Sequence, residues 1–483
     1  MYMAVEQTFF WYDLETTGIN PREDRIMQFA GQRTDLALNP IDEPVNVLIK
    51  LSEDILPSPD AILITGITPQ QTRADGVSEA EFLQFFSTQV ATPGTIFVGF
   101  NSIRFDDEFM RYVHYRNFYD PYAWQWKDGR SRWDLLDVVR MTRALRPEGI
   151  QWPTVDGKPG NRLELLTKAN NIEHVGAHDA LVDVRASIEL AKLIQKKQPK
   201  LFTWLLTHRD KASVKKIVGS GEPFVYSSGK YDNDAEKTTV AMHLVEHPKK
   251  AGALVYDLRY DPTPFLALSP VELAERWQWV KDQKAPPRLP VKTMQFNRCP
   301  AIAPIGVLDG PSQERIKIDL TKTAKHRETL QKHPEFTQHI LQALELLDQA
   351  QATRQSQADQ TVDARLYDGF FNDHDNTTMS VVRAAAPEEL AELAHDFHDT
   401  RLTQLLPLYK ARNFPQALTD EERAAWEAHR YAMIMEGGTT SRLARYMHRL
   451  QELAGSVKEA DKRYLLEELQ LYAESIMPVV DND

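Results

Sequence analysis

The sequence predicts three successive zones of different fold: an α/β domain, a β-rich module with flanking helices, and a helical domain. Over residues 1–199, strand-like runs alternate with helical patterns, as is typical of an α/β domain. Over residues 200–350, short β-rich runs are separated by Gly, Pro and Asn-Asp. Over residues 362–483 helical periodicity dominates and strand patterns are almost absent, which predicts a helical bundle. The polar segment 351–361 between them is interpreted as a linker.

The elements of each zone follow from its local pattern. Apolar runs in the first zone predict strands at Thr8–Asp13, Ile26–Arg33, Val45–Leu51 and Thr95–Phe100. Helical periodicity predicts helices there at Ser78–Ala91, Asp106–Asn117, Leu135–Leu145, Leu163–Ala169 and Ala180–Lys197. The second zone has a helical stretch at Leu201–Ile217, strands at Phe224–Ser227, Thr238–Val245, Ala253–Leu258 and Leu289–Phe296, and helices over Thr323–Ala350. The last zone has helical runs at Pro387–His398, Asp420–Met435 and Lys458–Ile476.

Composition limits the classes of function. A chain of 483 residues is too long for one ordinary core, so several domains are expected. No run approaches the roughly 20 apolar residues that cross a bilayer, and the first residues lack the basic start and apolar core of a signal peptide. Cys299 is the only cysteine, which excludes a disulfide framework and favours the cytoplasm. A net charge of −12 argues against coating nucleic acid with the whole surface, although a local basic groove stays possible.

The first predicted strand ends in two acids. Asp13 and Glu15 are two residues apart, so their side chains project from the same face of a strand. Two like charges side by side repel unless a cation lies between them, and carboxylate oxygens suit Mg²⁺ or Mn²⁺. A strand that ends in a polar turn is common, and it is the better explanation of the pair taken alone. The metal interpretation therefore needs support from the rest of the chain.

Two later motifs carry the missing parts. Asp106 and Asp107 follow the predicted strand Thr95–Phe100, and because acids are good caps at helix starts, capping explains one of them. His178 lies just before the last predicted helix of this zone, and Asp183 follows five residues later. Taken alone, His178 is explained as a surface or capping histidine.

The combination of four acids and one histidine is more specific than any part. Four carboxylates can hold two divalent cations roughly 3.5–4 Å apart, which stabilises the attacking and leaving oxygens of a phosphoryl displacement. A histidine nearby can take a proton from the attacking water at neutral pH. The order D-x-E, N-x-x-x-F-D and H-x-x-x-x-D resembles the DEDDh superfamily of 3′→5′ exonucleases, and its histidine separates it from the sister group that uses tyrosine.

Further stretches narrow the resemblance to the bacterial exodeoxyribonuclease I family. They are residues 116–124, 131–137, 144–150, 162–164, 207–209, 366–371 and 411–415. The resemblance therefore spans nearly the whole chain. It implies an α/β ribonuclease H-like catalytic domain, a β-rich SH3-like domain and an α-helical C-terminal domain, which match the three zones.

This resemblance implies a Mg²⁺-dependent enzyme that degrades single-stranded DNA 3′→5′ to 5′-mononucleotides, processively, in DNA repair and recombination. In this hypothesis each active site holds two Mg²⁺ ions, for which Mn²⁺ can substitute. Asp13 binds both metals, and Glu15 and Asp183 lie beside it. Asp106 acts on the second metal, and His178 is the general base.

Aromatic and basic residues crowd between Phe105 and Trp133, and unpaired bases stack on aromatic faces for roughly 1–3 kcal/mol each. Core packing is expected instead for three of these aromatics, Phe109, Tyr112 and Phe118. By resemblance, the strand contacts are Arg111, Tyr122, Trp126, Arg140 and Lys211, with Arg162 and Glu15 near the terminal nucleotide. Tyr367 is a further contact from the C-terminal domain, with a buried anchoring role as the alternative.

The resemblance also predicts partners: single-stranded DNA, and the acidic, Phe-ended tail of single-stranded DNA-binding protein, for which Arg146 and Trp204 are the matching positions. A monomer without membrane contact is expected. One alternative is an RNA exonuclease of the same superfamily, which would differ in its packing around the terminal 2′-OH. The other is a non-catalytic single-strand clamp, which would need a broken acid set, whereas all four acids and the histidine are present.

Overall fold

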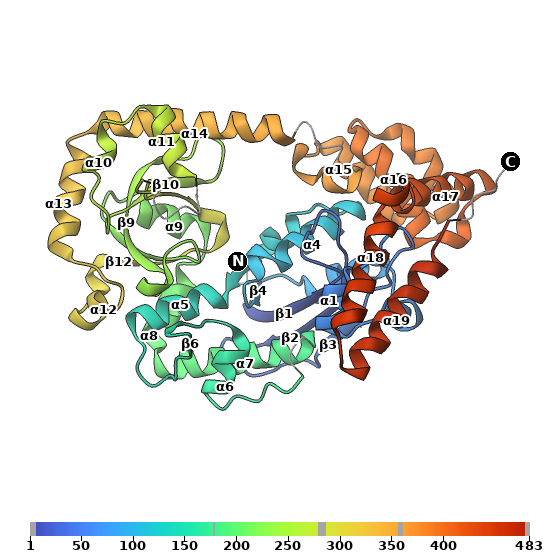
Figure 1. The fold of residues 1–483 in the computed structure, drawn as a ribbon, viewed down its shortest axis with the longest axis horizontal. Coiled ribbons are helices and arrows are strands. Elements are labelled where there is room, and N and C mark those ends of the chain that lie inside the picture. Colours follow the sequence, from blue (N-terminus) through green and yellow to red (C-terminus); the bar gives the residue numbers. More distant parts are fainter. Residues whose placement is uncertain (1–5, 177–178, 279–285, 356–360, 479–483) are drawn as a thin grey trace, which may run out of the picture. The chain divides into compact units, whose positions relative to one another are not determined.

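The computed structural model describes residues 6–176, 179–278, 286–355 and 361–478 (Figure 1). Its contacts divide the chain into two compact units. The first unit consists of Met1–Ser131, His174–Arg185 and Gln360–Asp483, and the second of Arg132–Glu173 and Ala186–Asp359. The first unit thus combines the N-terminal α/β segment with the C-terminal helices, although more than 200 residues separate them in the sequence.

A mixed sheet organises the first unit. Its strands are β1 (Thr8–Thr16), β2 (Ile26–Thr34), β3 (Val45–Leu48) and β4 (Thr95–Gly99). They lie in the order β3-β2-β1-β4, and β1 pairs antiparallel with β2 but parallel with β4. Because β1 lies inside the sheet, its apolar run over residues 9–12 is buried on both faces. The four strands predicted in this part of the chain are confirmed.

Short helices and aromatic packing cover this sheet. The helices are α1 (Pro59–Thr65), α2 (Pro69–Asp75), α3 (Glu79–Phe85) and α4 (Asp106–Arg116). The helix predicted over 78–91 is only partly regular, because α3 passes into a π-helical turn over Phe86–Val90. Phe82 and Phe86 bring their rings to 5.1 and 5.7 Å from those of Phe29 and Phe97, respectively, on the strands. Phe109, Tyr112 and Phe118 are buried, as predicted.

The C-terminal segment of the first unit is helical. Its helices are α15 (Asp373–Ala384), α16 (Thr400–Asn413), α17 (Asp420–Ile434), α18 (Arg442–Ser456) and α19 (Ala460–Ser475). Residues 361–478 form no strand, in agreement with the predicted bundle. The run predicted as an α-helix over 387–398 forms 3₁₀ turns over Pro387–Asp396 instead. Tyr446 and Leu469 share one apolar cluster with Met27 and Ile62, so the bundle and the α/β segment have a common core.

The second unit contains a five-stranded antiparallel sheet in the order β11-β10-β9-β8-β12. Its strands are β8 (Phe224–Ser227), β9 (Thr238–Glu246), β10 (Gly252–Asp257), β11 (Val291–Gln295) and β12 (Ala301–Pro304). The surrounding helices are α5 (Leu135–Leu145), α6 (Leu163–Ala169), α8 (Pro199–Thr207), α9 (Lys211–Val218), α11 (Pro270–Trp277), α13 (Leu320–Gln331) and α14 (Pro334–Gln355). Helix α7 (Ala180–Lys197) begins in the first unit and continues into the second.

Two predictions in this part of the chain need correction. The helical stretch predicted over 201–217 is two helices, because Asp210 caps a new helix by accepting hydrogen bonds from the backbone N–H groups of Ala212 and Ser213. The segment 351–361 was predicted as a linker, but α14 continues through Gln355, and residues 356–360 lie outside the described part of the chain. Nowhere in the described ranges does a helix combine the length and apolar character needed to cross a membrane.

Candidate active site

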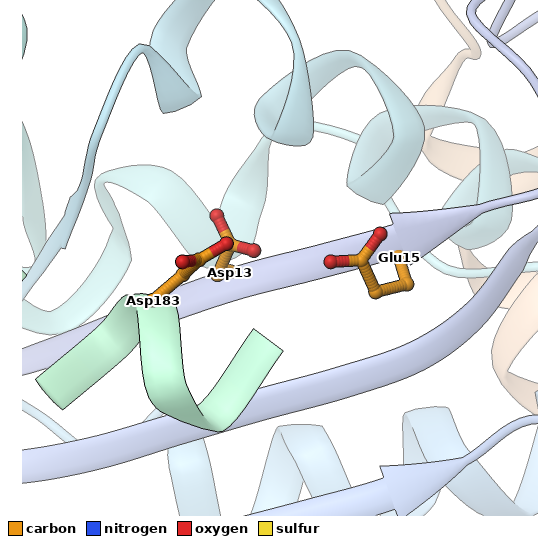
Figure 2. Close-up of side chains that lie close together, drawn as sticks. All are labelled: Asp13, Glu15 and Asp183. Carbon is orange, nitrogen blue, oxygen red and sulfur yellow. The ribbon is translucent and has the colours of Figure 1, made fainter. Parts of the chain in front are cut away.

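Three carboxylates meet at the end of β1. Asp13 and Glu15 project from the strand, and Asp183 projects from the first turn of α7, so that oxygens of all three lie within 4.8 Å of one another. Figure 2 shows Asp183 reaching from its helix toward Asp13, with Glu15 alongside on the same strand. The structure thus brings together three of the four acids that the sequence singled out, although about 170 residues separate the strand from the helix.

The strand register places α7 beside these acids. Glu15 pairs with Gln28 of β2 in the sheet. The buried Gln28 side chain accepts a hydrogen bond through its Oε1 from the backbone N–H of Ala180, at 3.3 Å, where α7 begins. Asp179 caps the same helix by accepting from the N–H of Leu181 at 2.9 Å. Together these bonds hold the first turn of α7, and with it Asp183, at the end of the strand.

Asp106, the fourth acid, is the buried first residue of α4. It follows a tight connection from β4, in which a side chain on Gly99 would meet the Ser102 Cβ at 2.6 Å, and Asn101 takes a left-handed φ of 70°. Asp106 is not among the three acids within 4.8 Å, but its charge acts on Asp13. The neighbouring Asp107 accepts a hydrogen bond from the Tyr12 hydroxyl.

The electrostatics of the site oppose three bare negative charges. Burial raises the pKa of Asp13 well above its ordinary value, and the charges of Asp106 and Asp183 raise it further. Burial also raises the pKa of Glu15 to about 9, with contributions from Asp13 and Asp183. Without a cation the cluster therefore retains protons. A divalent cation would reverse this effect, because its charge favours the ionised carboxylates.

The donor set fits a hard divalent cation. All three groups are carboxylates, and oxygen ligands are the ones that Mg²⁺ and Mn²⁺ prefer. The raised pKa values of Asp13 and Glu15 show that the fold holds acids together at an electrostatic cost, which a cation would offset. These two observations favour a metal site over a polar turn at the end of the strand.

Two histidines belong to this segment of the chain. His178, predicted as the general base, lies outside the described residues. His174 was not singled out from the sequence, yet its Nε2 is hydrogen-bonded to Oδ1 of Asp183. No local pattern marks His174, because it lies in a loop and meets Asp183 only in the folded chain.

Besides Glu15, four of the predicted substrate contacts lie in the first unit. Arg111 is buried, donates to Glu108 at 2.6 Å and to Gln125 at 3.0 Å, and lies 5.8 Å from the ring centre of Tyr122. Trp126 is 64% exposed and Tyr367 is 50% exposed, so neither residue is buried in the core. Tyr367 is thus not fully buried, although its hydroxyl is hydrogen-bonded to Glu108 and its ring lies 6.0 Å from that of Tyr112. Phe370 was not predicted as a contact, but it is 87% exposed and its ring lies 5.8 Å from that of Tyr122.

The other predicted contacts belong to the second unit. Arg140 pairs with Asp137 at 2.5 Å and lies against Gly229, while Arg162 and Lys211 are exposed at the starts of α6 and α9. Arg146 donates to the carbonyl oxygen of Val307 at 2.8 Å. Trp204 donates to the carbonyl oxygen of Ile302 at 2.9 Å and lines a shallow pocket of about 460 Å³.

Comparison with known families covers almost the whole chain. Residues 10–191 match the Exonuclease family model, residues 209–345 the Exonuclease I SH3-like domain, and residues 360–476 the Exonuclease I C-terminal domain. These matches confirm the predicted sequence of an exonuclease domain, an SH3-like domain and a helical domain.

Known proteins are similar over the same length. Exodeoxyribonuclease I of Escherichia coli K12 is 40% identical over 478 residues, which cover 98% of each chain. The zinc-bound form of the E. coli exonuclease I complex with single-stranded DNA has a TM-score of 0.90 at 39% identity, covering 98% of this chain and 99% of that one. The structure of SSB/exonuclease I with the inhibitor CFAM has a TM-score of 0.87 at 38% identity, covering 98% and 100%.

Proposed function

The chain belongs to the exodeoxyribonuclease I family, and from this membership we propose how its residues carry out the reaction. It is a 3′→5′ exodeoxyribonuclease of the DEDDh type that acts on single-stranded DNA. We propose that it releases 5′-mononucleotides with the help of two Mg²⁺ ions. The observation that carries this proposal is the convergence of Asp13, Glu15 and Asp183 within 4.8 Å.

In this proposal Asp13, Glu15 and Asp183 hold the cations, and Asp106 contributes from the start of α4. Bound divalent cations would stabilise the charge that develops on the oxygens of the scissile phosphate. The protein contributes by keeping these carboxylates rigid: two lie on an internal strand, and the other two lie in the first turns of helices, where the helix dipole favours negative charge. Mg²⁺ is the proposed ion because all donors are oxygens, and Mn²⁺ would substitute for the same reason.

His178 is proposed as the general base that accepts a proton from the attacking water. The support is its position in the sequence, five residues before Asp183, together with the chemistry of imidazole near neutral pH. His174 is the less suitable candidate, since its Nε2 is already engaged by Asp183.

Three aromatic rings are proposed to stack on unpaired bases of the strand: the half-buried ring of Tyr122 and the exposed rings of Trp126 and Tyr367. Arg111 would act beside them. From the second unit, the residues proposed to bind the strand are Arg140, Arg162 and Lys211. Arg162 and Glu15 would lie near the terminal nucleotide.

The pocket beside Trp204 is proposed to bind the tail of single-stranded DNA-binding protein. It is lined by Pro199, Lys200, Trp204 and His208, so an apolar surface lies next to basic groups. That combination suits an acidic peptide that ends in phenylalanine, and Arg146 would supply a further cation. We further propose that the enzyme works as a monomer, processively, in the cytoplasm, in DNA repair and recombination.

One assay tests the central proposal. Single-stranded DNA labelled at its 3′ or its 5′ end is incubated with enzyme in Mg²⁺ or in EDTA. We expect mononucleotide to be released at once from the 3′ label, only late from the 5′ label, and not in EDTA. Asp13→Ala and Asp183→Ala should abolish release, whereas Glu43→Ala, at an exposed acid, should not change it.

A matched RNA oligonucleotide is added to the same assay. Equal or faster digestion of RNA would favour the ribonuclease alternative. Near wild-type release by Asp13→Ala or Asp183→Ala would refute the metal assignment.

A further inference from the structure

We propose that His174 is a positioning residue for Asp183. Its imidazole holds one carboxylate oxygen of Asp183, so that the other oxygen stays directed at the metal site. This inference rests on the proposed metal role of Asp183 and extends it to a residue in a loop that neither the motifs nor the family comparison assigns.

The loop between α6 and α7 buries the histidine and exposes an apolar neighbour. The side chain of His174 is only 5% exposed, whereas the next residue, Val175, is 82% exposed. The hydrophobic effect alone would favour the opposite arrangement, because burying an imidazole gains little unless its nitrogens are bonded. A specific polar partner is therefore needed to explain the orientation of this loop.

That partner is Asp183. Nε2 of His174 is hydrogen-bonded to Oδ1 of Asp183, whose side chain is 17% exposed. An ionised carboxylate, the form that binds a cation, only accepts hydrogen bonds, so in the proposed metal-bound state Nε2 is the donor. Asp183 also has a carboxylate oxygen within 4.8 Å of those of Asp13 and Glu15, and because Oδ1 is engaged by His174 the proposal gives the metal-binding role to Oδ2.

This contact matters for the reaction because a helix fixes only the backbone of Asp183. The carboxylate can still turn about the side-chain bonds of the residue. A hydrogen bond from a buried ring fixes that rotation before a metal arrives. Groups that orient metal ligands in this way are typically worth about 10–100-fold in metal affinity or activity.

The test compares two substitutions of similar bulk. His174→Phe fills the space of the ring but cannot donate, and His174→Gln retains an N–H donor on a flexible chain. We expect His174→Phe to raise the Mg²⁺ concentration for half-maximal rate about tenfold or more, with an unchanged KM for DNA. His174→Gln should recover most of this loss, and Val175→Ala should behave like the wild type.

Metal binding to the full-length protein is measured in parallel by titration calorimetry with Mn²⁺, in the absence of DNA. Mn²⁺ affinity should fall for His174→Phe and recover for His174→Gln. The proposal is overturned if the two variants bind Mn²⁺ equally, or if His174→Phe leaves both the Mn²⁺ affinity and the Mg²⁺ requirement unchanged. Since this measurement needs no turnover, it separates failure of this inference from failure of the proposed reaction.

Discussion

At the scale of single residues, the site is a set of acids that the fold forces together. The raised pKa values of Asp13 and Glu15 show that the folded protein favours the neutral form of each side chain over the charged form. Such a cluster reduces the stability of the metal-free protein, and a bound cation offsets the cost. Replacing one of these acids should therefore raise the stability of the metal-free protein and lower its activity.

Glu15→Gln tests this balance. In the folded state the pKa of Glu15 is raised from 4.5 to about 9, so the folded form holds its proton more tightly than the unfolded form. Stability of the metal-free wild type is therefore lost as pH rises from about 4.5 to about 9, and the neutral glutamine avoids that loss. In EDTA at pH 8 we expect an apparent Tm about 2–4 °C above the wild type, by thermal denaturation.

The Tm difference between Glu15→Gln and the wild type should be smaller at pH 5, where the glutamate of the folded wild type is protonated. At pH 8 it should also become smaller when Mg²⁺ replaces EDTA. Nucleotide release should fall about a hundredfold or more. Two control variants at an exposed acid, Glu43→Gln and Glu43→Ala, should match the wild type throughout. A lower Tm for Glu15→Gln in EDTA would contradict the electrostatic account.

At the scale of elements, the site depends on how α7 joins the sheet. The side-chain amide of Gln28 forms hydrogen bonds with both α7 and β3. Its Oε1 accepts from the backbone N–H of Ala180, and its Nε2 donates to Oδ1 of Asn46 at 2.9 Å. Because the backbone of Gln28 also pairs with that of Glu15 in the sheet, one residue links the strand that carries two acids to the helix that carries the third. The arrangement of the three carboxylates therefore depends on β1, β2 and α7 together.

Gln28→Leu removes both hydrogen bonds at nearly constant volume. It leaves the buried N–H of Ala180 unsatisfied, so we expect a loss of about 1–3 kcal/mol in the free energy of unfolding. Asp183 should also be less well placed, with kcat lower by about tenfold. Denaturant unfolding and steady-state kinetics at saturating Mg²⁺ measure the two effects. Asn46→Ala, which removes only the bond to β3, is the matched control, and an equal loss of kcat there would contradict the role given to α7.

At the scale of the whole molecule, a buried ionic network joins distant parts of the first unit. Arg412 of α16 pairs with Asp54 at 2.6 Å and with Asp363 at 2.7 Å, and Asp363 also pairs with Arg25 at 3.2 Å. No side chain in this network is more than 7% exposed. Burial alone would raise the pKa of Asp363, but Arg412 and Arg25 hold it well below its usual range.

Asp363→Asn leaves two buried arginines with one charge partner fewer. Breaking a buried pair typically costs about 3–5 kcal/mol, so we expect a clearly lower Tm for the first unfolding transition. Since the pKa of Asp363 is depressed, its contribution is present above about pH 3.8 and should be constant from about pH 5 to 9. Glu23→Gln, in the exposed pair with Arg442 at 3.5 Å, should change stability by less than about 1 kcal/mol.

Activity of Asp363→Asn, measured well below its Tm, should stay close to that of the wild type, because the network does not touch the acids of the site. A Tm equal to that of the wild type would mean that the network adds no net stability to the first unit.

Much of the fold was predictable because strands and helices leave local periodic patterns. The strand from Thr8 and the helix Ala180–Lys197 were recognised from apolar runs and helical spacing, and both exist in the structure. The failures have local causes too. Asp210 starts a new helix inside a continuous helical pattern, and the polar residues up to Gln355 extend α14 although they lack apolar anchors.

The sequence by itself predicted the acids of the site, since residue type, order and spacing are enough to single out Asp13, Glu15, Asp106 and Asp183. Their chemistry depends on carboxylates, and carboxylates are visible in a sequence. Only the tertiary structure decided that Asp13, Glu15 and Asp183 lie within 4.8 Å of one another, that Gln28 is hydrogen-bonded to the start of α7, and that His174 is hydrogen-bonded to Asp183. The physical reason is that a hydrogen bond between residues distant in the chain leaves no periodic pattern, so supporting residues become visible only once the chain is folded.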